Sequence, residues 1–366
     1  MIISKIVLSN FRSFNKSEYS FSPGITVVVG PNASGKTNLI EAIFILGLTK
    51  SFRDIPDREA IYFGQEIGRV MGTVEKPDNR STNLEVILTK GEVTGIKTPY
   101  KKCQVNGVGK RIIDYVGNLK TVLFWPQDME LVTDSPSIRR KYLDFLLTQV
   151  DREYRRTLIS YERGIRQRNR VLEAIREHGA HRHQLIFWDQ LIIKAGEYIT
   201  KKREAYIDFI NSYELSETKF QIIGKYHLIY DKSIISKSRL EQYTKEEISS
   251  GVTLVGPHRD DVHFEIQSTG IKNYKNDFRD LSLFGSRGEQ RLAILWLKIC
   301  ELAYIEKETG EKPVLLLDDI FSELDSSHQK IIFQVIENQQ TIITTTDKHI
   351  IEADKIRDYL LVTLPS

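Results

Sequence analysis

The sequence has little cysteine and lacks any long apolar run. Its only cysteines, Cys103 and Cys300, are far apart and do not form a C-x-x-C pair. This argues against a disulfide scaffold and a cysteine-based zinc site, and it favours a reducing compartment. The first residues lack the apolar core of a signal peptide, and no stretch of about eighteen apolar residues is present to form a membrane span. We therefore expect a cytoplasmic protein with no membrane partner.

The sequence also lacks a strong excess of charge of either sign. The formal net charge is +3 over 366 residues, so any surface that binds nucleic acid must be a local feature. Hydrophobic residues make up 40% and charged residues 28%, an ordinary globular mixture. We find no internal repeat and no low-complexity tract. The length suits two domains, or one large domain with an insertion.

Hydrophobic periodicity divides the chain into two β-containing parts separated by a helical block. The pattern predicts strands at 2–8 and 25–29, a β-rich region at 60–125, and helices over 135–212 with a break at Asp151. Further elements are a turn at 10–16, a helix at 37–48, a loop at 177–183, strands at 221–230, 252–255, 314–317 and 341–346, and helices at 286–308 and after 325.

A glycine-rich segment lies between the predicted strand at 25–29 and the predicted helix at 37–48. It reads Gly30-Pro31-Asn32-Ala33-Ser34-Gly35-Lys36-Thr37 and fits G-x-x-x-x-G-K-[ST]. In such a loop, backbone N–H groups and the positive end of a helix dipole hold phosphate oxygens. A chance glycine-rich turn would not require both flanking elements. We therefore predict an ATP site in which Lys36 reaches the β- and γ-phosphates and Thr37 binds Mg²⁺.

Two carboxylates follow a distant apolar strand. Residues 314–317 are Val-Leu-Leu-Leu, and Asp318 and Asp319 come directly after them. A buried parallel strand delivers such residues to the edge of the sheet where ligands bind. An acidic helix cap would give the same letters. On a chain that carries a phosphate loop, however, we predict Asp318 as a Mg²⁺ ligand and Asp319 as the residue that orients or deprotonates the attacking water.

A third motif starts the predicted helix at 286–308. It reads Ser286-Arg287-Gly288-Glu289-Gln290, and Ser286 with Glu289 fits the capping box S-x-x-E. One interpretation is a helix cap alone. The other is a γ-phosphate site, because a serine hydroxyl at a helix N-terminus is an anion receptor.

The order of these motifs, followed by Ser-Glu-Leu-Asp at 322–325, resembles that of SMC/ABC-type ATPase heads. Other segments are similar to the RecF family in particular, and the resemblance runs from residue 2 to about residue 350. They are Leu-Ser-Asn-Phe-Arg at 8–12, Val-Asn-Gly-Val at 105–108, 135–144, 161–163 with 167–169, Gly-Pro-His-Arg-Asp-Asp at 256–261, and Thr-Thr-Thr-Asp at 344–347.

The resemblance implies a weak, DNA-stimulated ATPase with a short helical arm in place of a long coiled coil. It further implies an ATP-dependent homodimer in which Ser286 contacts the nucleotide of the other subunit. Members bind double-stranded DNA in the ATP state, act with RecR and RecO at single-strand gaps in DNA repair, replication and the SOS response, and help load the recombinase.

The resemblance also implies roles for three further residues. Arg12 and Asn38 would contact the nucleotide, and Gln127 would sense Mg²⁺ or water. This sequence departs from the usual family pattern at three positions: it has Arg287 and Glu289 where glutamines are common, and Gln127 where glutamate is common. After the last predicted strand stands Asp347, and His349 lies two positions later than the switch histidine of transporters would.

Basic residues cluster in the helical block. Residues 135–170 hold ten basic and four acidic side chains, and 201–203 is Lys-Lys-Arg. Such clustering is typical of contact with backbone phosphates, and a solvated helix face with internal ion pairs is the alternative. Without a base-reading module, DNA binding should be independent of sequence. The ten are Arg139, Arg140, Lys141, Arg152, Arg155, Arg156, Arg163, Arg166, Arg168 and Arg170.

Two smaller clusters have competing interpretations. His178, His181 and His183 are a weak metal candidate, and a solvated loop is the favoured interpretation. His258 lies in a segment, 256–261, that looks like a catalytic His/Asp site, and a turn between two strands or a contact between head and arm is at least as good an interpretation.

We predict an α/β fold, an ABC-type P-loop ATPase head with a mixed sheet and flanking helices, plus a helical arm subdomain. The predicted divisions are 1–130 and 221–366 for the head and 131–220 for the arm. A fused nuclease is disfavoured because only 47 residues follow Asp319, and a transporter because 283 positions separate Lys36 from Asp319. A nucleotide-switched protein–protein module or a defence-type ATPase without a direct DNA role is the alternative function.

Overall fold

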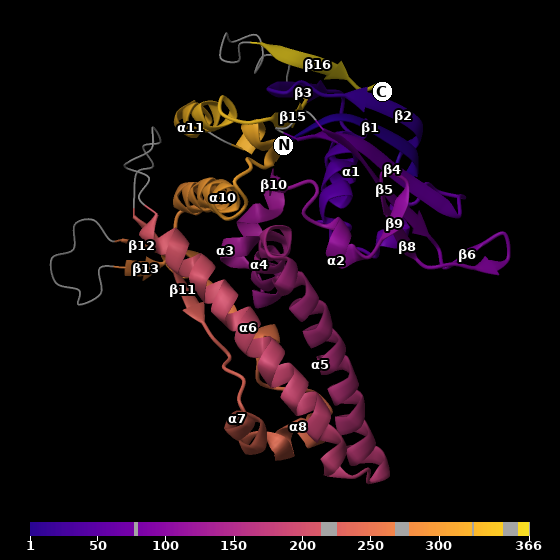
Figure 1. Ribbon diagram of the computed structural model, residues 1–366. Coiled ribbons are helices and arrows are strands. Elements are labelled where there is room, and N and C mark those ends of the chain that lie inside the picture. The colour runs from indigo at the N-terminus through magenta and orange to yellow at the C-terminus, as the bar shows by residue number, and fades with distance from the viewer. Residues whose placement is uncertain (77–79, 214–224, 268–277, 324–325, 347–357, 366) are drawn as a thin grey trace. The chain divides into compact units, whose positions relative to one another are not determined.

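The computed structural model describes residues 1–76, 80–213, 225–267, 278–323, 326–346 and 358–365 (Figure 1). The chain forms two compact units. Unit 1 comprises Met1–Asp128, Glu214–Ile222 and Leu295–Ser366. Unit 2 comprises Met129–Tyr213 and Ile223–Ile294. The predicted arm, 131–220, therefore supplies the long helices of unit 2, and the described residues 225–267 and 278–294 belong to the same unit.

Unit 1 contains a five-stranded parallel sheet. Its strand order is β10 (Thr121–Phe124), β14 (Val314–Asp318), β15 (Thr341–Thr345), β3 (Ile25–Val29) and β16 (Tyr359–Thr363). Every residue of the first four strands is buried, which explains their continuous apolar runs. Since parallel strands end at one edge, the segments after β3, β10, β14 and β15 meet there.

A six-stranded antiparallel sheet forms the other layer of unit 1. Its order is β2 (Phe14–Ser20), β1 (Ile2–Phe11), β4 (Ile67–Glu75), β5 (Ser81–Thr89), β8 (Lys101–Val105) and β9 (Val108–Lys110), and β6 (Glu92–Val93) and β7 (Ile96–Lys97) form a separate hairpin. Asn106 and Gly107, with φ of 50° and 76°, make the predicted turn. The predicted turn at 10–16 is wrong in extent. Arg12 and Ser13 alone connect β1 to β2, because the strands pair up to Phe11 and Phe14.

Helix α1 (Lys36–Leu48) lies between the two sheets of unit 1. It contacts β1, β4 and β5 on one side and β10, β14 and β15 on the other (Figure 1). It is buried almost all round, and a Cβ on Gly72 of β4 would come within 2.3 Å of Leu46. This packing fixes the helix that follows the glycine-rich segment. The remaining elements assigned to unit 1 are η1 (Asp57–Ala60), α2 (Ile112–Tyr115), η6 (Ile320–Glu323) and α11 (Ser326–Ile336).

Unit 2 is built on a long helical hairpin of α5 (Arg152–His178) and α6 (Leu185–Ser212), which pack along each other (Figure 1). Asp151 separates α4 (Pro136–Val150) from α5, as predicted, and its carboxylate accepts the backbone N–H groups of Glu153 and Tyr154. Helix α5 ends at Gly179, with φ of 64°, so the predicted loop starts two residues later than expected.

Smaller elements complete unit 2 and its borders. They are η2 (Pro126–Met129), α3 (Glu130–Thr133), η3 (Arg182–Gln184), α7 (Lys237–Gln242), α8 (Thr244–Ser250), η5 (Pro257–Arg259), α9 (Leu281–Phe284), the start of α10 (Arg287–Thr309), and a sheet of β11 (Tyr226–Asp231), β12 (Asp261–Gln267) and β13 (Phe278–Asp280). Within the described residues, no helix is long and apolar enough to cross a membrane.

The predicted strand at 252–255 is wrong. Its backbone groups bond side chains instead of a neighbouring strand: the N–H of Thr253 donates to Asn169, and the N–H of Leu254 donates to Glu247. The predicted strand at 221–230 is observed from Tyr226, and residues 221–224 lie outside the described part of the chain.

Candidate nucleotide-binding site

The segment 30–37 forms a tight loop between β3 and α1. Ala33 and Gly35 have φ of 66° and 97°, so successive N–H groups turn to one side of the chain. A Cβ on Gly35 would lie 2.9 Å from both the Phe14 ring and the Ser13 hydroxyl, so only glycine fits. The first N–H groups of α1 have no acceptors within the helix and add to the same concavity.

Two side chains of this loop favour a phosphate ligand. Lys36 is 8% exposed, and its Nζ donates to the carbonyl oxygens of Gly30 and Pro31, each at 2.8 Å. The Ser34 hydroxyl is buried and has no hydrogen-bond partner among the described residues. A Cβ on Gly30 would come within 2.5 Å of that hydroxyl, so the cradle is open only because residue 30 lacks a side chain. An orphaned hydroxyl in a ring of N–H groups fits a phosphate oxygen.

Asp318 and Asp319 lie at the same edge of the sheet as this loop. Asp318 ends β14, is buried, and accepts a 2.6 Å hydrogen bond from Thr344 of β15, the strand between β14 and β3. Asp319 has φ of 52°, and its N–H donates to both oxygens of Thr344. The two carboxylates are near Lys36: burial lowers the pKa of that ammonium, and Asp319 and Asp318 oppose the shift. Thr37, half-buried in the first turn of α1, is the remaining predicted Mg²⁺ ligand from this side.

Arg12 and Asn38 belong to a cluster around Glu41, which is fully buried on α1. Arg12 donates to both carboxylate oxygens of Glu41, at 2.9 and 2.5 Å, and also to the carbonyl of Glu59. Arg53 pairs with Glu41 at 3.4 Å and donates to the Asn38 amide oxygen at 3.0 Å. Arg12 and Asn38 therefore already have partners within the protein.

Gln127 lies just beyond the end of β10, next to β14, and is exposed. The following residue, Asp128, anchors this segment: its carboxylate accepts the N–H of Trp125 at 3.0 Å and pairs with Lys298 of α10 at 3.2 Å. Lys298 also pairs with Glu301 at 3.5 Å, and all three side chains are buried. Burial opposes the charge on Lys298, but Asp128 and Glu301 raise its pKa above the ordinary value.

Ser286 starts α10 and belongs to unit 2. It forms the predicted capping box: the Glu289 N–H donates to the Ser286 hydroxyl at 3.3 Å, and the Ser286 N–H donates to the Glu289 carboxylate at 2.8 Å. That backbone N–H is the main cause of the lowered pKa of Glu289, and Arg279 adds to it. Ser286 is exposed, so its hydroxyl hydrogen can still reach a ligand in solution.

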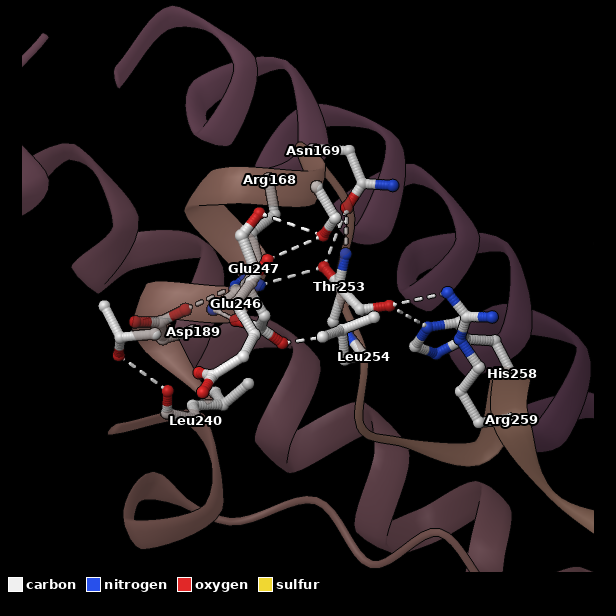
Figure 2. A network of polar contacts seen from close by, with 12 residues as sticks. Arg168, Asn169, Asp189, Leu240, Glu246, Glu247, Thr253, Leu254, His258 and Arg259 are labelled. Atoms are coloured by element: carbon white, nitrogen blue, oxygen red, sulfur yellow. Dashed lines mark hydrogen bonds and ion pairs between the residues drawn. The ribbon is translucent and has the colours of Figure 1, made fainter. Parts of the chain in front are cut away.

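Several residues of the predicted basic cluster are buried ion-pair partners. Arg168 is 2% exposed and donates to Asp189 at 2.7 Å, Thr253 at 2.9 Å and Glu247 at 2.7 Å (Figure 2). Arg203 is equally buried and pairs with Asp144 and Asp260. The prediction that this cluster contacts backbone phosphates therefore does not extend to its buried members, whose side chains are enclosed within unit 2. They are Arg139, Arg155, Arg168 and Arg203.

The segment 256–261 is part of this polar packing in unit 2. His258 accepts at Nδ1 from the Tyr161 hydroxyl at 2.7 Å and donates from Nε2 to the Thr253 carbonyl at 3.0 Å, and burial lowers its pKa to about 4. Gly256 has φ of 124°, and a Cβ there would lie 2.4 Å from the Tyr161 hydroxyl. A neutral, doubly bonded histidine supports the interpretation of this segment as a structural turn.

Some predicted positions cannot be placed. Leu324, Asp325, Asp347 and His349 lie outside the described residues, as do the side chains of Ser322 and Glu323. Within the described part of the chain, no three His, Cys, Asp or Glu side chains are grouped to hold a metal, so His178, His181 and His183 do not form such a site.

The fold and site of unit 1 define a P-loop ATPase head, with the phosphate loop after one parallel strand and carboxylates after another. The family model described as the RecF/RecN/SMC N terminal domain matches residues 2–362. The SMC head from Pyrococcus furiosus, 17% identical, has the same fold with a TM-score of 0.52 and 99% of this chain covered.

Comparison with sequence relatives identifies a narrower family than the fold alone. The DNA replication and repair protein RecF of Halalkalibacterium halodurans is 36% identical over 95% of this chain and 93% of its own length, and that of Herpetosiphon aurantiacus is 33% identical over 95% and 94%. A structure of the recombination mediator protein RecF with ATPrS, in the RecFOR pathway, is 31% identical, with a TM-score of 0.85 over 100% of this chain and 96% of that one. The chain belongs to the RecF family of DNA replication and repair ATPases.

Sequence reasoning missed the residues that support the site. Asp128 follows the predicted Gln127 directly, and its partner Lys298 lies in the middle of an amphipathic helix. A lysine on the apolar stripe of a helix is a signal for a buried ion pair. Glu41 has the same signature, since it lies between apolar residues on α1.

Proposed function

We propose that this protein binds ATP with Mg²⁺, hydrolyses it weakly, and binds double-stranded DNA without sequence preference in recombinational repair and at replication forks. The observation that carries the ATP site is the phosphate cradle, with its orphaned Ser34 hydroxyl and two left-handed residues. The solved RecF structures with ATP and ATPrS add support by family membership.

Each site residue has a specific role in this proposal. The backbone of residues 30–35 and Lys36 bind the phosphates, Thr37 and Asp318 hold Mg²⁺ with Gln127 near its outer shell, and Asp319 orients or deprotonates the attacking water. Bound Mg²⁺ would neutralise charge on the β- and γ-phosphates. Arg12 and Asn38 would contact the nucleotide with the hydrogens that their present partners leave unused.

The second part of the proposal is a nucleotide-dependent homodimer, in which Ser286 faces the γ-phosphate bound by the other subunit. The exposed hydroxyl at the N-terminus of α10 supports this role. Action with RecR and RecO at single-strand gaps, where they load the recombinase, is proposed from family membership and from the RecFOR pathway named for the solved relatives.

The proposal is tested by fluorescence anisotropy of a labelled mixed-sequence duplex with ATP, ADP or no nucleotide. We expect binding that tightens with ATP and weakens with salt, and Lys36→Met should remove the ATP effect because the ammonium no longer reaches the phosphates. If the wild-type protein binds no duplex at low salt in any nucleotide state, the DNA role is wrong. The protein is then better described as a nucleotide-switched protein–protein module.

A further inference from the structure

The long helix α5 has two opposite faces of different character. Its buried side chains include Tyr154, Leu158, Tyr161 and Leu172, which lie on the side packed against the rest of unit 2. At about 100° per residue, these four positions fall within one sector of roughly 60°. The face on the other side carries the exposed arginines.

Five exposed arginines form one line along that outer face. At about 100° per residue, they fall within roughly 80° of one another, and they span about 27 Å of helix. We call this line the α5 arginine stripe, and its members are Arg152, Arg156, Arg163, Arg166 and Arg170.

The stripe is only partly neutralised by neighbouring carboxylates. Arg156 pairs with Glu153 at 2.8 Å, and Arg166 is 4.0 Å from Glu162, both in exposed positions. Arg163 and Arg170 have no carboxylate within ion-pair distance among the described residues. Exposed pairs of this kind are worth little and exchange readily for another anion. The outer face therefore presents a net positive line.

We propose that the α5 arginine stripe is the surface of unit 2 that contacts the sugar–phosphate backbone of duplex DNA. This inference rests on the proposed DNA-binding function and assigns it to particular residues. Guanidinium groups bind phosphate oxygens in a bidentate manner and read no base when they remain outside the grooves. A line of about 27 Å matches roughly eight base pairs of backbone at 3.4 Å per pair. The structure thus separates the basic cluster into buried arginines that hold unit 2 together and exposed arginines that bind phosphates.

The test compares two triple variants that each remove three exposed positive charges from unit 2. The stripe variant is Arg163→Gln/Arg166→Gln/Arg170→Gln. The control is Lys194→Gln/Lys201→Gln/Lys245→Gln, which changes exposed lysines of α6 and α8. Both should keep the wild-type melting temperature and ATP affinity, because all six side chains lie at the surface.

Duplex binding with ATP is measured by anisotropy over a series of KCl concentrations. We expect the stripe variant to lose about 2.7 from the slope of log K against log salt, at about 0.9 for each phosphate contact, while the control stays close to the wild type. A stripe variant with the wild-type slope and affinity overturns the assignment even though the protein binds DNA. An equal loss in the control shows a general charge effect and overturns it too.

The other candidate occupant of the stripe is an acidic protein surface, and polyglutamate serves as its probe. If the stripe variant loses affinity for polyglutamate but keeps that for duplex, the stripe serves a protein partner and the DNA assignment is wrong. If the wild type itself binds no duplex in any nucleotide state, both the assignment and the proposed DNA function fail.

Discussion

The phosphate cradle of unit 1 and the polar network of unit 2 are both rich in buried charged or polar groups, but they differ in how those groups are satisfied. In unit 2, Arg168 finds three acceptors within the chain, and Glu247 accepts from both Arg168 and the backbone (Figure 2). In unit 1, the Ser34 hydroxyl is buried and finds no hydrogen-bond partner in the described part of the chain, beside backbone held in left-handed conformations.

This difference distinguishes buried polar groups that stabilise the fold from buried polar groups that await a ligand. A buried polar group that is satisfied within the chain stabilises one packing arrangement, and an unsatisfied group in a strained loop is retained because a ligand completes it. By this criterion we assign the segment 256–261 to the structural groups, although its sequence looks catalytic, and we propose the loop at 30–37 as the functional site.

The largest expected effect is a loss of stability when the hydrogen-bond network around Arg168 in unit 2 is broken. Arg168→Met leaves Glu247, which is 0% exposed, without its cation, and should lower the free energy of unfolding by about 3–5 kcal/mol. Urea denaturation measures this loss. The matched control, Arg170→Met, changes an exposed residue two positions away and should stay within about 0.5 kcal/mol.

A double variant tests whether the loss of stability comes from the unpaired charge of Glu247. Arg168→Met/Glu247→Gln removes the uncompensated charge and should recover part of the lost stability. An Arg168→Met protein as stable as the wild type would show that the network is not saturated in the way the distances indicate.

The next effect concerns pH, through His258. Its folded pKa of about 4 lies below the ordinary 6.5, so the unfolded chain binds more protons between these values. Stability should therefore be fully present above about pH 6.5 and fall by roughly 3 kcal/mol as the pH drops towards 4. His258→Asn should remove that part of the pH dependence, measured as the difference between the two unfolding profiles. Parallel profiles for both proteins would contradict a neutral, buried histidine.

Much of the cradle could be predicted from sequence, because its strand, loop and helix follow one another directly along the chain and the motif fixes the spacing of its glycines, lysine and threonine. Ala33 and Gly35, which turn the backbone, lie in one short segment, so the motif spacing alone predicts where the loop forms. The buried ion pairs could not be predicted. The partners of Arg168 are 21, 79 and 85 positions away in the sequence. A count of charged residues in a segment cannot identify such distant partners, so it predicts an exposed arginine. The predicted strand at 252–255 failed for the same reason, since its backbone bonds go to distant side chains.

A smaller effect tests whether the buried ion pairs of Lys298 in unit 1 support ATP hydrolysis. Lys298→Met removes the cation that holds Asp128, which in turn bonds the Trp125 N–H and positions the segment with Gln127. We expect kcat for ATP hydrolysis to fall by roughly tenfold, since small displacements of positioning groups are costly. Phosphate release measures kcat and KM, and thermal melting measures stability.

Lys120→Met is the control for this variant. Lys120 is also a buried lysine of unit 1, and it pairs with Glu311 at 2.6 Å, away from the Gln127 segment. We expect this variant to lose stability and keep its kcat. Equal losses of kcat in both variants would show that destabilisation of unit 1 alone explains the effect.

The smallest effect concerns Ser286, which is at once a satisfied cap and an exposed candidate for a phosphate contact. Ser286→Ala should cost about 1 kcal/mol of unfolding free energy through loss of the cap. Ser286→Asp restores a good cap but places a negative charge where the γ-phosphate of the other subunit would bind. It should therefore keep the wild-type stability and lose ATP-dependent dimerisation in sedimentation velocity, as Ser286→Arg should. If Ser286→Asp and Ser286→Arg both dimerise normally with ATP, Ser286 is only a cap, and it belongs with the saturated groups of unit 2.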